Sequence, residues 1–167
     1  MKKSQLYGEI FVYVLTTVLI SLILIYGYNA VHKFNERAEL VSCLKFKNDL
    51  KKSIESIITD FGTVKKKEFE LCSGYIKICF VESVSLDKSK VAASTDDPII
   101  KDSISSDREE NAFLVDGTAK EQFYVGKISV LDDPSDDKVV KCIKTINNKI
   151  TLRLEGKGDH TKISEWK

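Results

Sequence analysis

The chain opens with a long run of apolar residues, and the spacing of polar and apolar positions changes twice behind it. Residues 10–31 form a run of 22 residues without a charged side chain. At a helical rise of about 1.5 Å per residue this run reaches about 33 Å, enough to cross the roughly 30 Å hydrocarbon layer of a bilayer. The pattern predicts a membrane-spanning helix, whose simplest function is that of an anchor.

The helical pattern continues beyond this run with a different character. From residue 43 onward, apolar positions recur at spacings of three and four residues, which places them on one face of an amphipathic helix. They are Cys43, Phe46, Leu50, Ile54, Ile57 and Phe61. A single helix from about Leu6 to Asp60, ended by Gly62, accounts for both halves. The alternative is two helices broken near Gly27 or Asn29.

Behind this helix the apolar period becomes two, which is typical of β-strands. Asp97-Pro98 is a helix cap followed by proline, so a short helix is expected over 99–105. Asp116-Gly117 and Asn147-Asn148 predict tight turns between strands. The strands are expected at 63–71, 75–82, 112–115, 122–130, 138–146, 149–155 and 160–166. The predicted fold class is therefore α+β, with the long N-terminal helix packed on an antiparallel β-sheet head.

Nine residues precede the apolar run, and they carry both signs of charge. Lys2 and Lys3 give a positive start, and Glu9 stands directly against the apolar segment. A carboxylate at the edge of hydrocarbon is costly and points to a partner or a function. The run is too long for the apolar core of a secretory signal peptide, which has about 7 to 15 residues, and no small-residue cleavage site follows it. Any cleavage is therefore expected in front of the helix.

The segment Lys2-Lys3-Ser4-Gln5-Leu6-Tyr7-Gly8-Glu9 before an apolar helix resembles the class III signal of archaeal type IV pilin-like and archaellin-like proteins. The resemblance implies that a prepilin-type signal peptidase cuts between Ser4 and Gln5, with Lys3 before the cut and Glu9 as the fifth residue after it. In such filaments the apolar helices bundle as a core, and the glutamate offsets the new terminal ammonium of a neighbouring copy. The alternative is that Glu9 lies at headgroup level beside Lys3 in an uncleaved anchor.

This interpretation divides the chain into four parts. Residues 1–4 are the leader, 5–31 the transmembrane or filament-core helix, 32–62 its amphipathic continuation and 63–167 the β-rich head. The charges on the two sides of the run differ little, so the positive-inside bias is weak. The short leader and the resemblance place the N-terminus in the cytoplasm and the head outside the cell.

The net charge and the cysteine content limit which partners and which cysteine chemistry are expected. The net charge of +1 implies no nucleic acid, and the run Lys65-Lys66-Lys67 is interpreted as a solvated strand edge. Four cysteines in a chain placed outside the cell favour disulfides over buried free thiols or a zinc site, although spacing alone leaves three pairings open. The favoured pair is Cys79 with Cys142, because both lie in apolar strand-like runs, which leaves Cys43 with Cys72.

The sequence offers no catalytic constellation. It has two histidines, and it contains no Gly-x-Ser-x-Gly, phosphate-cradling glycine loop or HExxH motif, so no enzyme activity and no cofactor are predicted. His160 beside Asp159 is interpreted as a surface pair. Trp166 and Phe113 are interpreted as core or sheet cover. Four aspartates could bind calcium, but a solvated acidic turn is favoured for them. They are Asp132, Asp133, Asp136 and Asp137.

Two functions therefore remain for the chain as a whole. The leading hypothesis is a pilin-like structural subunit of an archaeal surface filament, inserted in membrane lipid before it associates with copies of itself or related subunits. The alternative is a single-pass, membrane-anchored extracytoplasmic domain that binds a partner or serves a structural role without forming filaments. An enzyme ranks third.

Overall fold

The computed structural model describes residues 3–72, 74–84, 94–106, 108–131 and 138–166. The chain divides into two compact units, Met1–Val41 and Ser42–Lys167, and each is described here by itself. The helices are α1 (Lys3–Glu55) and α3 (Pro98–Ser105). The strands are β1 (Val64–Glu70), β2 (Lys77–Val81), β3 (Ala112–Asp116), β4 (Thr118–Phe123), β5 (Ile128–Ser129), β6 (Val140–Lys144), β7 (Lys149–Gly156) and β8 (Thr161–Glu165).

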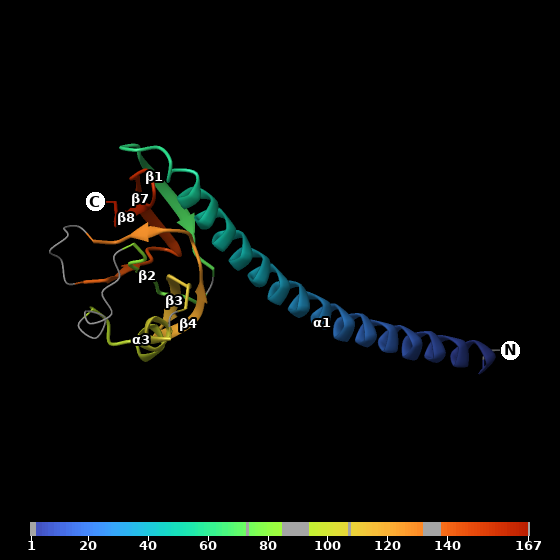
Figure 1. Cartoon of the computed structure of the whole chain (residues 1–167). Helices are drawn as coiled ribbons and strands as arrows, with labels where there is room; N and C mark the ends of the chain where they lie inside the picture. Colours follow the sequence, from blue (N-terminus) through green and yellow to red (C-terminus); the bar gives the residue numbers. More distant parts are fainter. Residues whose placement is uncertain (1–2, 73, 85–93, 107, 132–137, 167) are drawn as a thin grey trace. The chain divides into compact units, whose positions relative to one another are not determined.

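The second unit, which we call the head, contains two four-stranded sheets. Sheet A has the strand order β1-β7-β8-β5, and sheet B has the order β4-β3-β2-β6. All the neighbouring strands run antiparallel except β5 and β8, which are parallel. Figure 1 shows the strands of both sheets and α3 in the head. The predicted α+β class is confirmed, with two sheets where the sequence analysis expected one.

The last turns of α1 and the turn that follows them form part of the main core of the head. Phe46, Leu50, Ile54 and Ile57 are almost fully buried and belong to one apolar cluster with residues of both sheets. Phe46 meets two aromatic rings edge to face, with its ring centroid 6.3 Å from that of Phe69 and 6.4 Å from that of Phe123. The amphipathic face predicted from the sequence is therefore the face that the head buries.

A second apolar cluster lies on the opposite face of sheet B, beneath α3. Ile100 and Ile104 of α3 pack there with residues of β2, β3 and β6. The strand β2 is consequently buried on both faces, because Ile78 and Phe80 belong to the main core and Cys79 and Val81 to the second cluster.

The end of α1 differs from the prediction. The helix ends at Glu55 rather than near Asp60, and the following residues form turns. The turn packs against β7 so closely that a Cβ on Gly156 would stand 2.2 Å from the Ile57 carbonyl oxygen. Phe61, expected on the buried face, is 79% exposed because it lies beyond the helix. The helix therefore ends before Gly62, which is not its stop.

One strand prediction also needs correction, and the order of the strands in the sequence does not give their pairing. The segments 63–71 and 75–82 follow each other in sequence, but β1 pairs with β7 while β2 pairs with β3 and β6. The predicted strand over 122–130 is wrong, because β4 ends at Phe123 and only the two residues of β5 are extended again. The turn at Asn147-Asn148 is confirmed, and both residues adopt positive φ angles, 53° and 58°.

Candidate functional site

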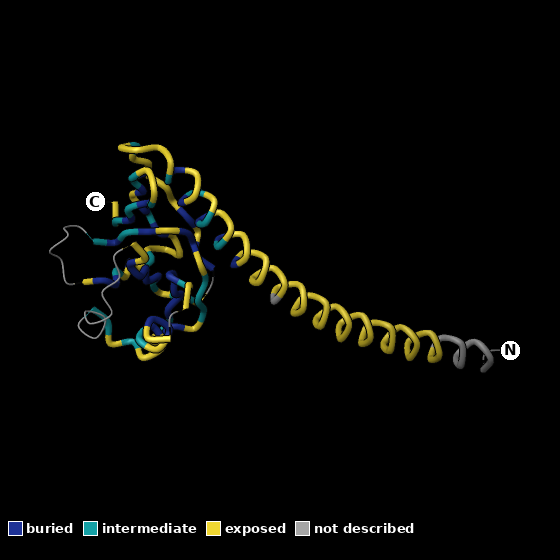
Figure 2. Tube along the Cα trace, viewed as in Figure 1, coloured by how far each residue is buried: buried dark blue, intermediate teal, exposed yellow. Residues whose placement is uncertain are grey.

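The first unit presents an apolar helical surface that its own chain leaves uncovered. Ile10–Glu55 contains an 18-residue window with mean hydropathy 2.4, and no residue of that window is buried. Figure 2 shows this half of α1 exposed, whereas the last turns of the helix and the head contain buried residues. Phe11, Ile23 and Leu24 are each 67–69% exposed. A helix of this length and composition is compatible with a single membrane span.

The hydroxyl groups within the apolar run are satisfied by the helix itself. Thr16 Oγ1 and Thr17 Oγ1 both donate to the carbonyl oxygen of Tyr13, at 2.9 and 2.8 Å. Ser21 Oγ donates to the carbonyl oxygen of Thr17 at 2.9 Å. These bonds remove the cost of placing hydroxyl groups in hydrocarbon or in a bundle of helices.

The residues of the predicted processing site lie in the first turns of the same helix. The backbone of Lys3, Ser4, Gln5 and Glu9 is helical. Their side chains lie outside the described part of the structure, as do Met1 and Lys2 altogether. The cleavage site and the assembly role of Glu9 therefore remain predictions from the sequence.

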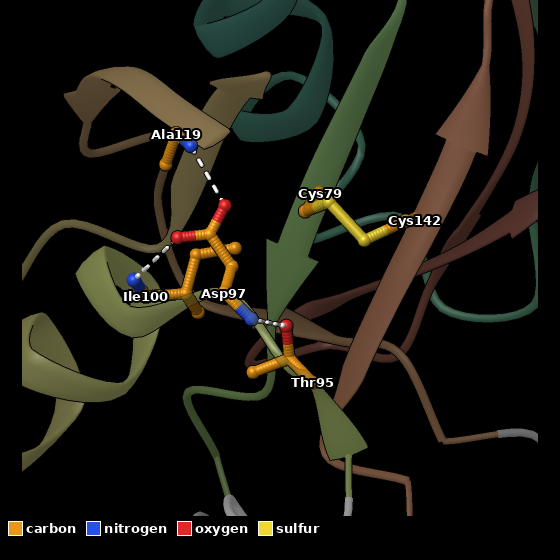
Figure 3. The surroundings of a disulfide bond; sticks show 6 residues. All are labelled: Cys79, Thr95, Asp97, Ile100, Ala119 and Cys142. Atoms are coloured by element: carbon orange, nitrogen blue, oxygen red, sulfur yellow. Dashed lines mark hydrogen bonds between the residues drawn. A yellow bond between two sulfur atoms is a disulfide. The ribbon is translucent and has the colours of Figure 1, made fainter. Parts of the chain in front are cut away.

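Two disulfides hold the head together, and their pairing is the one that the sequence analysis favoured. Cys43–Cys72 joins α1 to the segment that precedes β2, across 29 residues of sequence. Cys79–Cys142 joins β2 to β6 across 63 residues, and Figure 3 shows it bridging the two neighbouring strands. In the usual entropic account, closing loops of these lengths stabilises a fold by about 4 kcal/mol each. Both disulfides lie within the head, which suits an extracytoplasmic domain.

Asp97 fixes the short helix α3 to sheet B (Figure 3). One carboxylate oxygen accepts from the N–H groups of Ile99 and Ile100, at 3.0 and 3.4 Å, and therefore caps the helix. The other accepts from the N–H of Ala119 in β4 at 2.7 Å. The sequence predicted the cap, but the contact with Ala119 could not be predicted because it joins residues 22 positions apart.

A buried polar network holds the link between β4 and β5, and the sequence analysis missed it. The Glu82 carboxylate is 1% exposed and accepts from the N–H of Val130 at 2.9 Å and the hydroxyl of Ser129 at 3.0 Å. The Asn111 side chain is 3% exposed, donates to Gly126 O at 2.7 Å and accepts from Val125 N at 3.0 Å. No local sequence signal marks these residues, since their partners lie 14 to 48 positions away.

A cavity of about 340 Å³ lies beside this network at the ends of β2 and β4. Its lining includes Glu82, Arg108, Tyr124 and Lys127, so both signs of charge surround it. The volume is at the lower end of the range for small-molecule sites, about 300–1,000 Å³. Within the described residues, no group of three or more His, Cys, Asp or Glu side chains is arranged to hold a metal ion.

The structure also shows where the other residues singled out in the sequence analysis lie. His160 Nδ1 lies 2.7 Å from Asp159 Oδ1, and this hydrogen bond holds the pKa of Asp159 below its ordinary value. Phe113 is fully buried, whereas Trp166 is 41% exposed with Lys66 Nζ 5.4 Å from its ring centroid. The run of lysines at 65–67 is exposed on β1, the edge strand of sheet A. The aspartates at 132, 133, 136 and 137 lie outside the described residues.

Charge interactions in the head are mainly local surface pairs. The ammonium of Lys149 lies 2.9 Å from Glu68 Oε1, and this contact lowers the pKa of Glu68 and raises that of Lys149. The hydrogen bond from Lys157 lowers the pKa of Glu155. Burial, and then the nearby Glu121 carboxylate, raises the pKa of Tyr75. Each pair joins side chains near the surface, so these interactions contribute little to stability individually.

Comparison with known proteins gives no relative from which a function could be transferred: no protein family, curated protein or solved structure matches this chain.

Proposed function

We propose that this chain is a pilin-like structural subunit of an archaeal cell-surface filament, inserted in the membrane before assembly. The observation that carries the proposal is the uncovered apolar half of α1, preceded by a leader that resembles a class III signal. Burying one large aliphatic or aromatic side chain is worth about 1.5–3 kcal/mol. The exposed run contains more than a dozen such side chains, so lipid or other helices must cover it.

The composition of the apolar run supports packing against a second helix as well as against lipid. Tyr13, Thr17 and Ser21 follow each other at intervals of four residues, which places them along one side of the helix. Small and hydroxyl-bearing residues are enriched where membrane helices contact each other. In the proposed filament this side faces neighbouring helices, and Glu9 stands one turn ahead of Tyr13, at the end where the new ammonium is released.

The head supports an extracytoplasmic position. It contains two disulfides, and disulfides persist in oxidising surroundings outside the cytoplasm. We place the N-terminus in the cytoplasm and the head outside the cell. The signal peptidase then removes residues 1–4 at the cytoplasmic face, and the apolar helix remains part of the mature subunit.

Mass spectrometry of the protein from its native membrane tests the first step. The proposal expects a mature chain that begins at Gln5. An intact Met1 would exclude cleavage and leave only the anchor.

Assembly is tested separately by Glu9→Ala, with Glu39→Ala as the matched control because Glu39 lies further along the same helix and is exposed. We expect Glu9→Ala to abolish or strongly reduce filaments in electron micrographs while membrane insertion is retained. The control should assemble normally. Normal filaments from Glu9→Ala would show that no charge pairing at this residue is needed.

The second candidate function is a single-pass anchored domain that binds a partner and forms no filament. The cavity between Glu82, Arg108, Tyr124 and Lys127 favours it, because a filament subunit needs no such site. This function predicts a monomer in mild detergent with an uncleaved leader, and no filaments at any expression level. Recovery of filaments containing the chain would exclude it.

A further inference from the structure

The two disulfides differ in how exposed their cysteine residues are. In Cys79–Cys142, Cys79 is 1% exposed and lies in the cluster beneath α3, whereas Cys142 is exposed. Cys142 belongs to β6, the last strand of sheet B. Cys43 and Cys72 are 9% and 3% exposed, so both residues of the other disulfide are buried. Thiol–disulfide exchange requires direct attack on a sulfur atom, so Cys142 is the accessible point of attack.

The charges around the two disulfides also differ. Lys77 and Lys144 are directly opposite each other on β2 and β6, two residues from Cys79 and Cys142. Because side chains alternate along a strand, both lysines share the face of sheet B that carries this disulfide. Neither lysine takes part in an ion pair with any residue that the structure describes. Like charges directly opposite in a sheet repel each other, so an anion placed near them is favourable.

The carboxylates nearby are already engaged. Asp97, which lies near the same disulfide in Figure 3, accepts hydrogen bonds from three backbone N–H groups. At the other disulfide, the Sγ of Cys43 lies 3.7 Å from Oε2 of Glu121, which also contacts Lys47 Nζ at 2.6 Å. An engaged carboxylate therefore lies near each disulfide, and this feature does not distinguish them. Access favours exchange at Cys79–Cys142 over Cys43–Cys72, and the lysine pair at Cys79–Cys142 adds an attraction for anions.

We propose that Cys79–Cys142 is a thiol–disulfide exchange site that small anionic thiols enter at Cys142. The attacking thiolate forms a new S–S bond with Cys142 Sγ, and the bond to Cys79 breaks. Cys79 leaves as a thiolate and takes a proton from water. A second thiolate then attacks the mixed disulfide at its outer sulfur, which releases the oxidised thiol and leaves Cys142 reduced. Lys77 and Lys144 attract the anionic thiol and stabilise the departing thiolate.

This site is independent of filament formation, because it needs only the folded head. The mixed-disulfide intermediate is a head in which β6 keeps its hydrogen bonds to β2 and Cys142 carries a thiol adduct until a second thiolate removes it. The strand at the edge of sheet B thus becomes a reversible attachment point for a thiol-bearing molecule.

The test uses the oxidised full-length chain in detergent micelles. It is exposed to mercaptoethanesulfonate, which is anionic, or to cysteamine, which is cationic, at equal thiolate concentrations. The reaction is quenched with an alkylating reagent, and digested peptides are identified by mass spectrometry. We expect the adduct on Cys142 and the alkyl group on Cys79, while Cys43 and Cys72 remain joined.

The charge contribution is tested with the double variant Lys77→Gln/Lys144→Gln. Two lost charges near the sulfur should slow mercaptoethanesulfonate about threefold to tenfold and leave cysteamine unchanged or faster. Lys66→Gln is the control, because Lys66 lies over Trp166 on sheet A. It should change neither rate. The rate of opening of Cys43–Cys72, measured in the same samples, reports whether a variant has loosened the fold.

Three results would overturn the proposal. The first is opening of Cys43–Cys72 before or together with Cys79–Cys142 in the unmodified chain. The second is an adduct on Cys79. The third is equal sensitivity of the double variant and the unmodified chain to the anionic thiol.

Discussion

The close contact between Gly156 and the turn after α1 makes Gly156→Ala a strong test of the head's architecture. A Cβ at this residue would stand 2.2 Å from the Ile57 carbonyl oxygen and 2.4 Å from that of Asp60. An ordinary carbon–oxygen contact is about 3.3 Å, so the turn would have to move by about 1 Å. The Gly156 backbone is not left-handed, so alanine itself is compatible with its conformation. The whole cost therefore comes from the steric contact.

The loss of stability expected from Gly156→Ala follows from the hydrogen bonds between the displaced turn and β7. Gly62 N donates to Gly156 O at 2.9 Å, Gly156 N donates to Thr63 O at 3.0 Å, and Gly158 N donates to Ile58 O at 2.8 Å. Overpacking costs about 1–3 kcal/mol, and each weakened hydrogen bond about 1 kcal/mol. We expect Gly156→Ala to lower the free energy of unfolding by about 4–6 kcal/mol.

The measurement is urea unfolding of the full chain in detergent with both disulfides intact, followed by the fluorescence of Trp166, its only tryptophan. Gly117→Ala is the matched control, because a Cβ there meets nothing within 4 Å. Its positive φ of 77° costs about 1–2 kcal/mol. If Gly156→Ala loses no more stability than Gly117→Ala, the close packing of the turn on β7 is incorrect.

Four further substitutions test three separate parts of the head in the same assay. Asp97→Ala removes the cap of α3 and its bond to β4, and should cost about 2 kcal/mol. Ile57→Ala should lower the free energy of unfolding by about 2–5 kcal/mol, because Ile57 is buried, whereas Phe61→Ala should change it by less than about 0.5 kcal/mol. Equal losses from the two variants would indicate that Phe61 is buried too, as in the longer helix predicted from the sequence. The pKa of Glu155 is lowered from 4.5 by Lys157, so its stabilisation is present above about pH 4.5 and is lost as the pH falls below it. Glu155→Gln should therefore lose less stability than the unmodified chain between pH 5 and pH 3, and parallel curves would contradict this.

Local patterns predicted the elements whose determinants are close in sequence. The apolar face from Cys43 to Ile57 is buried as its spacing indicates. Asp97 caps α3, and the turn at Asp116-Gly117 joins β3 to β4. In each case the relevant residues lie within about one or two turns of one another, so hydrogen bonding and periodicity within a short segment decide the outcome.

Features that depend on distant partners could not be predicted in this way. The pairing of β1 with β7 joins residues more than 70 positions apart, and nothing in either strand excludes the sequence-adjacent β2 as the partner. The parallel contact of β5 with β8 rests on two residue pairs. Glu82 comes directly after β2, at the start of a polar stretch of sequence. Its burial therefore cannot be distinguished from the exposure of a loop residue until its hydrogen-bond partners are known.

Cys43 marks the boundary between the exposed part of α1 and the part that is buried in the head. Every described residue of α1 from Ile10 to Ser42 is exposed, and Cys43 is the first buried residue of the helix. The disulfide to Cys72 is therefore located where the helix begins to belong to the core of the head. The covalent bond ties the helix, at its first buried residue, to the segment before β2. Both proposed functions use a head held in this way.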